Sequence, residues 1–182
     1  PDRSSVTEVH GVLALAEARR VYSALWPLAE SELGHPAYQA LTLAYSLNQE
    51  EIESAEEAAM RIVDECKILF RSIDAILTPT LPIAPPQAGA RSISLNGRKM
   101  PIISALVAET CLSNITGGPA IVLPSRGGHE TETASIQLIG APGSDAALFR
   151  RAYQIEEALS ARAHVTRRLE SSRLHPPTER GI

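Results

Sequence analysis

The sequence contains only two cysteines, Cys66 and Cys111, among its 182 residues. They lie far apart in segments of apolar periodicity, which favours two buried free thiols over a disulfide or a pair of metal ligands. Free thiols are typical of a reducing compartment. The sequence therefore predicts a cytoplasmic protein without a disulfide.

An excess of basic residues and any long apolar run are also missing. The formal net charge is −4 at pH 7, so the chain offers no positive field to nucleic acid. No apolar stretch is long enough to cross a bilayer, and the first residues, "PDRSSVTEVHG", lack the basic start and apolar centre of a signal peptide. We expect neither nucleic acid nor a membrane as a partner.

The residue patterns that carry common catalytic and cofactor chemistry are absent as well. The sequence has no G-x-S-x-G nucleophile elbow, no P-loop and no closely spaced His or Cys ligands for zinc. Its five histidines are scattered singly, and its lysines, Lys67 and Lys99, read as solvated side chains. We therefore expect no metal and no cofactor, and these residues alone indicate no reaction.

Helical periodicity dominates the first part of the chain. Apolar residues recur at helical spacing from Val12 to Glu32, where Pro27 should kink or end the run, and a second helix is expected over Ala37–Leu47. The clearest helix follows, because Asn48 and Glu51 form a capping-box pattern before an acidic first turn. Its apolar face consists of Ile52, Ala55, Ala59, Ile62, Cys66, Leu69 and Ile73. This pattern predicts an amphipathic helix packed on a core.

Strand-like runs dominate the second part. Ala75–Leu77 is a short apolar run of the kind buried in parallel sheets, and Asn96-Gly97 is a strong signal for a β-hairpin. The runs "AIVLP" and "ASIQLIG" predict two more strands, separated by a polar loop. Together with the helices, these strands predict an α/β fold.

Two further helices are expected around these strands. The segment "PIISALVAETCLSN" reads as one helix, and the last helix should begin at a cap formed by Ser144 or Asp145. One face of the first of these helices carries small, mostly apolar residues at spacings of three and four: Ser104, Val107, Ala108 and Cys111. Glu109 lies away from the centre of this face, so the face itself has no acid.

Gly117 and Gly118, in "NITGGPAIVLP", stand between a helical segment and a strand. Two interpretations are open and compatible. The glycines let the backbone pass close to another group, or they form a tight turn that needs a positive φ.

The order of these segments resembles a known family. The run "DAILTPTLPIAPP", the hairpin, Thr110 before "NITGGPAIVLP", and "IQLIGAPGSDAALFRRAYQIEEAL" are together similar to the C-terminal part of the amidase signature enzymes. The resemblance extends from about Ala16 to Leu159. It implies an α/β fold with a mixed central sheet flanked by helices, with residues 1–170 as the C-terminal part of an amidase domain and 171–182 as a disordered tail.

The resemblance also implies which residues take part in function. Enzymes of this family cleave or transfer amide nitrogen through a Ser-cis-Ser-Lys triad in a Gly/Ser-rich stretch of their N-terminal half. This chain has no Gly-Gly-Ser-Ser stretch, and neither lysine has the required context. The face of Ser104, Val107, Ala108 and Cys111 would help line the acyl pocket, unless it simply faces the core. The loop residues Thr80, Asn114, Thr116, Gly117 and Gly118 would brace that pocket.

Three hypotheses follow for the function. The chain is the C-terminal segment of an amidase, inactive alone, that needs its N-terminal catalytic half or associates with itself. Alternatively, it is a non-catalytic accessory subunit or binding module that docks on a separate catalytic partner, or a domain that shares only the fold. For the complete enzyme, a small apolar or aryl carboxamide is favoured over glutamine as substrate, because the predicted face lacks an acid.

Overall fold

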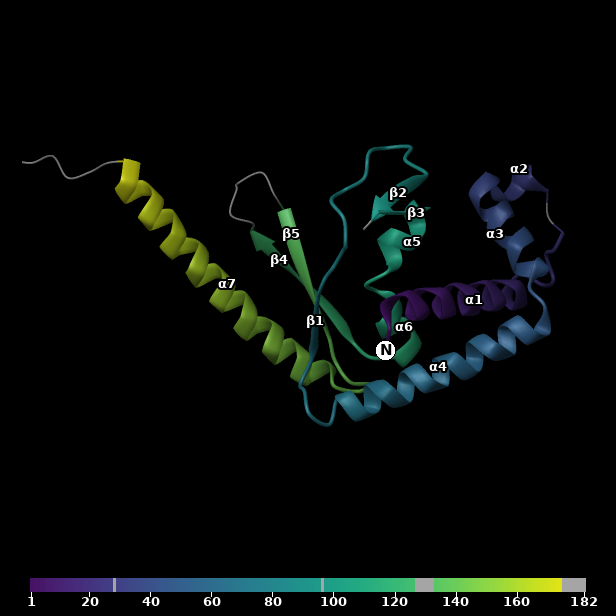
Figure 1. The fold of residues 1–182 in the computed structure, drawn as a ribbon, viewed down its shortest axis with the longest axis horizontal. Coiled ribbons are helices and arrows are strands. Elements are labelled where there is room, and N and C mark those ends of the chain that lie inside the picture. The colour runs from purple at the N-terminus through teal and green to yellow at the C-terminus, as the bar shows by residue number, and fades with distance from the viewer. Residues whose placement is uncertain (28, 96, 127–132, 175–182) are drawn as a thin grey trace, which may run out of the picture.

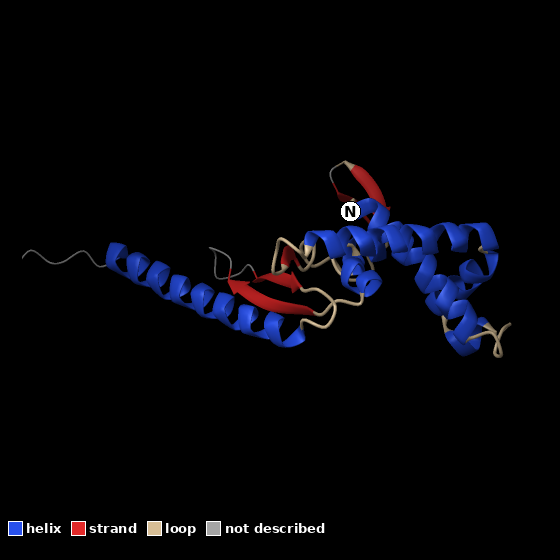
Figure 2. Cartoon of the chain, turned by 90° about the horizontal axis from the view of Figure 1, so that it is seen from below, coloured by secondary structure: helices blue, strands red, loops and turns tan. Residues whose placement is uncertain are grey.

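The computed structural model describes residues 1–27, 29–95, 97–126 and 133–174. The elements in chain order are α1 (Arg3–Val21), α2 (Glu30–Leu33), α3 (His35–Ser46), α4 (Gln49–Leu69), β1 (Ile76–Pro79), β2 (Ser92–Leu95), β3 (Arg98–Pro101), α5 (Ile102–Val107), α6 (Cys111–Thr116), β4 (Ala120–Arg126), β5 (Thr133–Ile139) and α7 (Asp145–Leu174). A group of helices lies beside a small sheet, and α7 runs along that sheet and projects away from the rest of the chain (Figures 1 and 2). The predicted α/β class is confirmed.

The first helix begins and ends earlier than the periodicity predicts. The side chain of Asp2 accepts a hydrogen bond from the backbone N–H of Ser5 at 3.0 Å and so caps α1, which starts at Arg3 rather than Val12. The helix ends at Val21, and the short α2 follows after a turn that contains Pro27. The predicted interruption of the run at Pro27 is confirmed, but the helix already ends at Val21, because apolar spacing alone does not show at which residue a chain turns.

The helix α4 forms as its cap predicts. Asn48 Oδ1 accepts from the N–H of Glu51 at 2.8 Å, while Glu51 Oε2 accepts from the N–H of Asn48 at 2.8 Å. This reciprocal pair satisfies two donors that the first turn of a helix leaves free. The apolar face of α4 packs against α1 and α6 in a first core of Val6, Val9, Ile62, Cys66 and Cys111.

The three-stranded sheet has the order β1-β5-β4, and both pairings are antiparallel. The expectation of a buried parallel strand at Ala75–Leu77 is therefore wrong for this sheet. β1 lies at one end of this strand order and alternates between half-buried and exposed positions, with Leu77 59% exposed, as a strand of an antiparallel sheet with one solvated face does. A short apolar run does not reveal the direction of its partner strand when, as here, that partner lies far along the chain and no short connection joins the two.

The sheet has two different faces. On one face, Leu123 and Leu138 pack against Leu148 and Ala152 of α7 in a second core. Burying each leucine stabilises the fold by about 2 kcal/mol. On the opposite face, Thr78 of β1 pairs in register with Gln137 of β5, which is only 2% exposed. That face lies against the connection between α5 and α6, because Gln137 bonds to it.

The hairpin β2–β3 is confirmed, with Gly97 at φ +77 in its loop. The segment that follows does not form the single predicted helix. It forms α5 and α6, which end and begin on either side of residues 108–110. The strands predicted from "AIVLP" and "ASIQLIG" are confirmed as β4 and β5.

The last helix, α7, begins after the predicted cap. The carbonyl of Ser144 accepts from the N–H of Leu148 at 2.9 Å, so Ser144 occupies the capping position before Asp145. The helix extends to Leu174, four residues into the segment 171–182 predicted as a tail. The remaining residues, 175–182, lie outside the described part of the chain.

Candidate functional site

The corner between α5 and α6, residues 108–110, is the centre of the predicted site. The carbonyl of Val107, at the end of α5, accepts from the N–H and from Oγ1 of Thr110, each at 3.0 Å. Cys111 Sγ donates to the same carbonyl at 3.1 Å. These three local bonds close the corner and give it a defined shape.

The four predicted substrate-binding residues do not share one helix face, because the corner divides them. Ser104, Val107 and Ala108 are half-buried on α5 and at the corner, whereas Cys111 is fully buried on α6. Cys111 packs in the first core with Cys66, and Val107 contacts the same core. Within this chain Cys111 is therefore a core residue, and the role of Ser104, Val107 and Ala108 in a pocket stays a prediction.

Both cysteines are free thiols, as the sequence predicts. Burial raises the pKa of the Cys66 thiol and of the Cys111 thiol, because the charged thiolate is poorly solvated there. Raised thiol pKa values keep both groups protonated and unreactive at neutral pH. Neither cysteine is placed to act as a nucleophile.

Glu109, at the corner, is buried although its position in the sequence does not indicate this. It is only 4% exposed, and its Oε1 lies 2.9 Å from Nη1 of Arg3 on α1. The guanidinium N–H does not point at that oxygen, so the contact is an ion pair without a hydrogen bond. Burial raises the pKa of the Glu109 carboxyl, and the charge of Arg3 opposes this rise. An acid within a helical pattern carries no sequence signal for such burial.

The two interpretations of the glycine pair both hold, one for each glycine. Gly117 ends α6 in the left-handed region at φ +66, and its N–H donates to the carbonyl of Ser113 at 2.9 Å. A Cβ at Gly118 would lie 2.3 Å from the carbonyl oxygen of Gly140, directly after β5. The backbone of Gly118 therefore passes close to the neighbouring chain segment.

The other predicted bracing residues have separate partners. Thr116 Oγ1 donates to the carbonyl of Leu112 at 2.9 Å and accepts from the N–H of Gly118 at 3.4 Å, so it does brace the turn. Asn114 contacts His10 of α1 through Nδ2 and Nε2 at 3.1 Å. The N–H of Thr80 donates to the carbonyl of Ser135 at 3.1 Å and extends the pairing of β1 with β5. Of the three, it is thus Thr116 that braces the glycine turn by a hydrogen bond.

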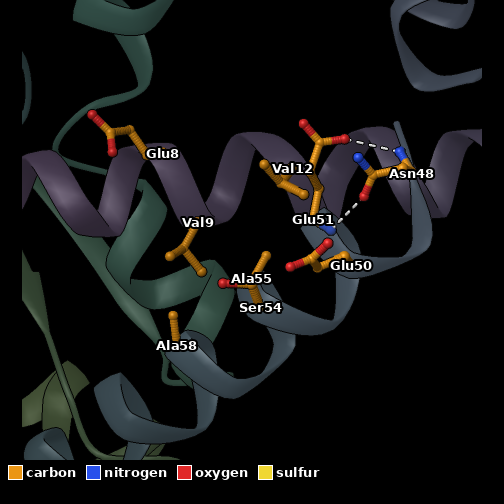
Figure 3. Close-up of a pocket in the computed structure, with 9 residues that line it drawn as sticks. All are labelled: Glu8, Val9, Val12, Asn48, Glu50, Glu51, Ser54, Ala55 and Ala58. Carbon is orange, nitrogen blue, oxygen red and sulfur yellow. Dashed lines mark hydrogen bonds between the residues drawn. The ribbon is translucent and has the colours of Figure 1, made fainter. Parts of the chain in front are cut away.

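A surface groove of about 430 Å³ runs between α1 and α4, away from these residues (Figure 3). Apolar side chains and three glutamates, Glu8, Glu50 and Glu51, are among the residues that line it. The lining residues are Glu8, Val9, Val12, Asn48, Glu50, Glu51, Ser54, Ala55 and Ala58. None of the predicted substrate-binding or bracing residues is among them, so the groove is separate from the predicted pocket.

Metal-binding clusters and membrane-spanning helices are both missing from the described residues. Among residues 1–27, 29–95, 97–126 and 133–174, no three His, Cys, Asp or Glu side chains lie in a group that could hold a metal ion. No helix in the same part of the chain is both long and apolar enough to cross a bilayer.

Burial of Glu109 predicts a pH dependence of stability. The raised pKa means that the folded chain holds this proton more tightly than the unfolded chain, whose carboxyl has the ordinary value of 4.5. The stabilising contribution is therefore present below pH 4.5 and is lost as the pH rises through the raised pKa. Relative to the wild type, Glu109→Gln should become progressively more stable as the pH is raised from about 4 to 8 in thermal unfolding experiments.

The control for this experiment is Glu56→Gln, which removes one exposed negative charge of α4. Arg3→Gln should steepen the wild-type loss of stability, because it removes the charge that opposes the rise. A constant difference between Glu109→Gln and the wild type across the pH range would contradict the prediction.

The glycine turn predicts a graded series of stabilities. Gly118→Ala should lower the free energy of unfolding by about 1–3 kcal/mol, because its Cβ would meet backbone. Gly117→Ala should lower it by about 1 kcal/mol through the positive φ. Gly11→Ala is the matched control: it lies within α1 with open space around its Cβ, and should raise stability by about 0.5–1 kcal/mol. Urea unfolding measures all three, and equal stabilities for Gly118→Ala and the wild type would refute the close approach.

Comparison with known proteins identifies the family of this chain. The family profile described as Amidase matches residues 19–149. Among curated relatives, a fatty acid amide hydrolase of Oryza sativa subsp. japonica is 31% identical over 120 residues, which is 65% of this chain and 19% of that protein. A putative amidase AmiC of Mycobacterium tuberculosis is 34% identical over 89 residues, which is 49% of this chain and 19% of that protein. The chain thus spans about a fifth of the length of these relatives.

Solved structures show the same fold. A crystal structure described as an amidase superposes with a TM-score of 0.76 at 22% identity, over 85% of this chain and 35% of that one. A bacterial aryl acylamidase, described as one of the amidase signature enzymes, superposes with a TM-score of 0.61 at 17% identity, over 80% of this chain and 32% of that one. The resemblance noted in the sequence is therefore confirmed, and the chain belongs to the amidase family.

Proposed function

We propose that this chain supplies the C-terminal part of an enzyme that hydrolyses the C–N bond of a carboxamide. The observation that carries the proposal is the family match over a chain that spans about a fifth of its curated relatives and contains no Gly-Gly-Ser-Ser stretch. Chemistry therefore requires a Ser-cis-Ser-Lys triad from another part of the enzyme. In this proposal the chain contributes sheet core and one wall of the acyl pocket.

The open sheet supports a partner for this chain. Within the described residues, β1 and β4 each pair along one edge only. Leu77 is 59% exposed on β1 and Val122 is 48% exposed on β4. Unpaired strand edges and exposed apolar side chains are normally covered in a stable protein. We propose the N-terminal catalytic half of an amidase as the partner, with a second copy of the chain as the competing occupant.

The substrate class follows from what the proposed wall offers. Ser104, Val107 and Ala108 are small and mostly apolar, and the acid at the corner, Glu109, is already paired with Arg3. A substrate ammonium group would find no free carboxylate on this wall, and burying it unpaired would cost several kcal/mol, on the order of 2–7. An apolar or aryl carboxamide therefore fits better than glutamine. The name of one curated relative, a fatty acid amide hydrolase, agrees with this choice.

Complementation tests the proposal directly. Alone, the purified chain should release no ammonia from carboxamides and should not react with a fluorophosphonate probe, because it lacks the triad. Mixed with the N-terminal half of an amidase of solved structure, it should co-elute with that half and restore ammonia release from an aryl carboxamide. Stoichiometric labelling of a serine in the isolated chain would contradict the proposal, and co-elution without activity would favour the accessory-subunit hypothesis.

The proposed pocket wall has a separate test in the reconstituted enzyme. Val107→Asp should lower the ratio of activity on an aryl carboxamide to activity on glutamine by about tenfold or more. The reason is that a carboxylate facing an apolar acyl group is poorly solvated. Val21→Asp is the matched control, since Val21 is 67% exposed at the end of α1. An unchanged ratio for Val107→Asp would remove Val107 from the pocket.

A further inference from the structure

The α5–α6 corner is held in place by contacts that come from two other parts of the fold. The local bonds to the carbonyl of Val107 join residues only three or four positions apart. Such bonds fix the shape of the corner, but they cannot fix its position relative to the sheet. Two long-range polar contacts reach Glu109 from elsewhere in the fold, one from the sheet and one from α1.

The first long-range contact comes from the sheet. Nε2 of Gln137, on β5, donates to the backbone carbonyl of Glu109 at 2.8 Å across a separation of 28 residues. The same amide nitrogen donates to Oγ1 of Thr78, on β1, at 3.3 Å. Gln137 is 2% exposed, so water does not compete for either bond. A buried amide left without these partners would be costly, which makes the arrangement specific.

The second long-range contact, from Arg3 of α1 to the Glu109 side chain, is of a different kind. Arg3 is 61% exposed and forms no hydrogen bond to Oε1 of Glu109. An ion pair with one solvated partner permits a range of positions and is weakened by salt. The hydrogen bond from Gln137 is therefore the contact that sets where the corner lies above the sheet.

We propose that Gln137 is a positioning residue, which holds the α5–α6 corner against the sheet and so sets the position of the acyl-pocket wall formed by Ser104, Val107 and Ala108. The pocket in this proposal rests on the proposed function. The hydrogen bond from Gln137 to the carbonyl of Glu109, which we call the clamp, is a property of this chain. Ala108 directly precedes Glu109, so a shift of the Glu109 carbonyl moves the wall with it. Gln137 itself does not touch the substrate in this proposal.

The two buried thiols allow the clamp to be tested in the chain alone. Cys111 begins α6 directly after the corner, whereas Cys66 lies on α4 in the same core. Local release of the corner should expose only Cys111, while global unfolding exposes both thiols. Iodoacetamide labelling followed by mass spectrometry of the two peptides therefore separates the two events, with Cys66 as the internal reference.

In this experiment, Gln137→Leu should raise the labelling rate of Cys111 relative to that of Cys66 by about tenfold or more, because the corner loses its hydrogen bond to the sheet. Gln154→Leu, at an exposed position of α7, is the matched control and should leave the ratio unchanged. Gln137→Asn is a second variant, for use if Gln137→Leu does not fold. It keeps the amide but shortens the side chain by one methylene, and it should also raise the labelling rate of Cys111 relative to Cys66. An unchanged ratio, or a parallel rise at both cysteines, would overturn the proposal.

The reconstituted enzyme gives a readout that loss of stability alone would not change. With the folded fraction matched, Gln137→Leu should raise KM for an aryl carboxamide about tenfold and lower kcat less than about threefold, because the acyl wall moves while the triad stays in place. A fall in kcat of about tenfold with KM unchanged would overturn the positioning role. If the wild-type mixture is inactive, the proposed function fails, whereas the ratio of Cys111 to Cys66 labelling still decides whether the clamp exists.

Discussion

The buried amide of Gln137 joins two parts of the structure that otherwise have separate cores. One core lies between α1, α4 and α6, and the other lies between the sheet and α7. Apolar packing within each core does not determine how the two cores sit against each other, because apolar contacts are not directional. The hydrogen bond from Gln137 to the carbonyl of Glu109 is directional and shielded from water, so it links them in one arrangement.

The backbone between α6 and β4 adds a second constraint on the same arrangement. Gly118 lies so close to the carbonyl of Gly140 that no side chain fits between them, and the N–H of Gly140 donates to the carbonyl of Pro119 at 2.9 Å. The start of β4 and the end of β5 are therefore held together just after α6 ends. A helix from the first core thus continues into a strand of the second core within a few residues, with little freedom at the joint.

These two constraints fix the position of the proposed pocket wall relative to the open sheet. The wall leads into the corner through Ala108. Within the described part of the chain, β1 and β4 each have one edge that pairs with no other strand, and these edges would offer places for the strands of a partner. Glu109 forms an ion pair with Arg3, so the proposed wall has no free acid. Amide selectivity and assembly would thus depend on different residues of the same short chain.

Features that depend on local chemistry could be predicted from the amino-acid sequence. The capping box of Asn48 and Glu51 and the loop at Gly97 depend on residues three positions apart or fewer, and both form as predicted. The order of motifs also revealed the family. The break after Val107 was not apparent from the apolar spacing, although local bonds close it. Other features emerged only in the folded chain: the antiparallel pairing of β1 with β5 and the burial of Glu109. Each of these depends on a partner distant in the chain, and the free energy of such a contact appears only once folding has brought the two segments together.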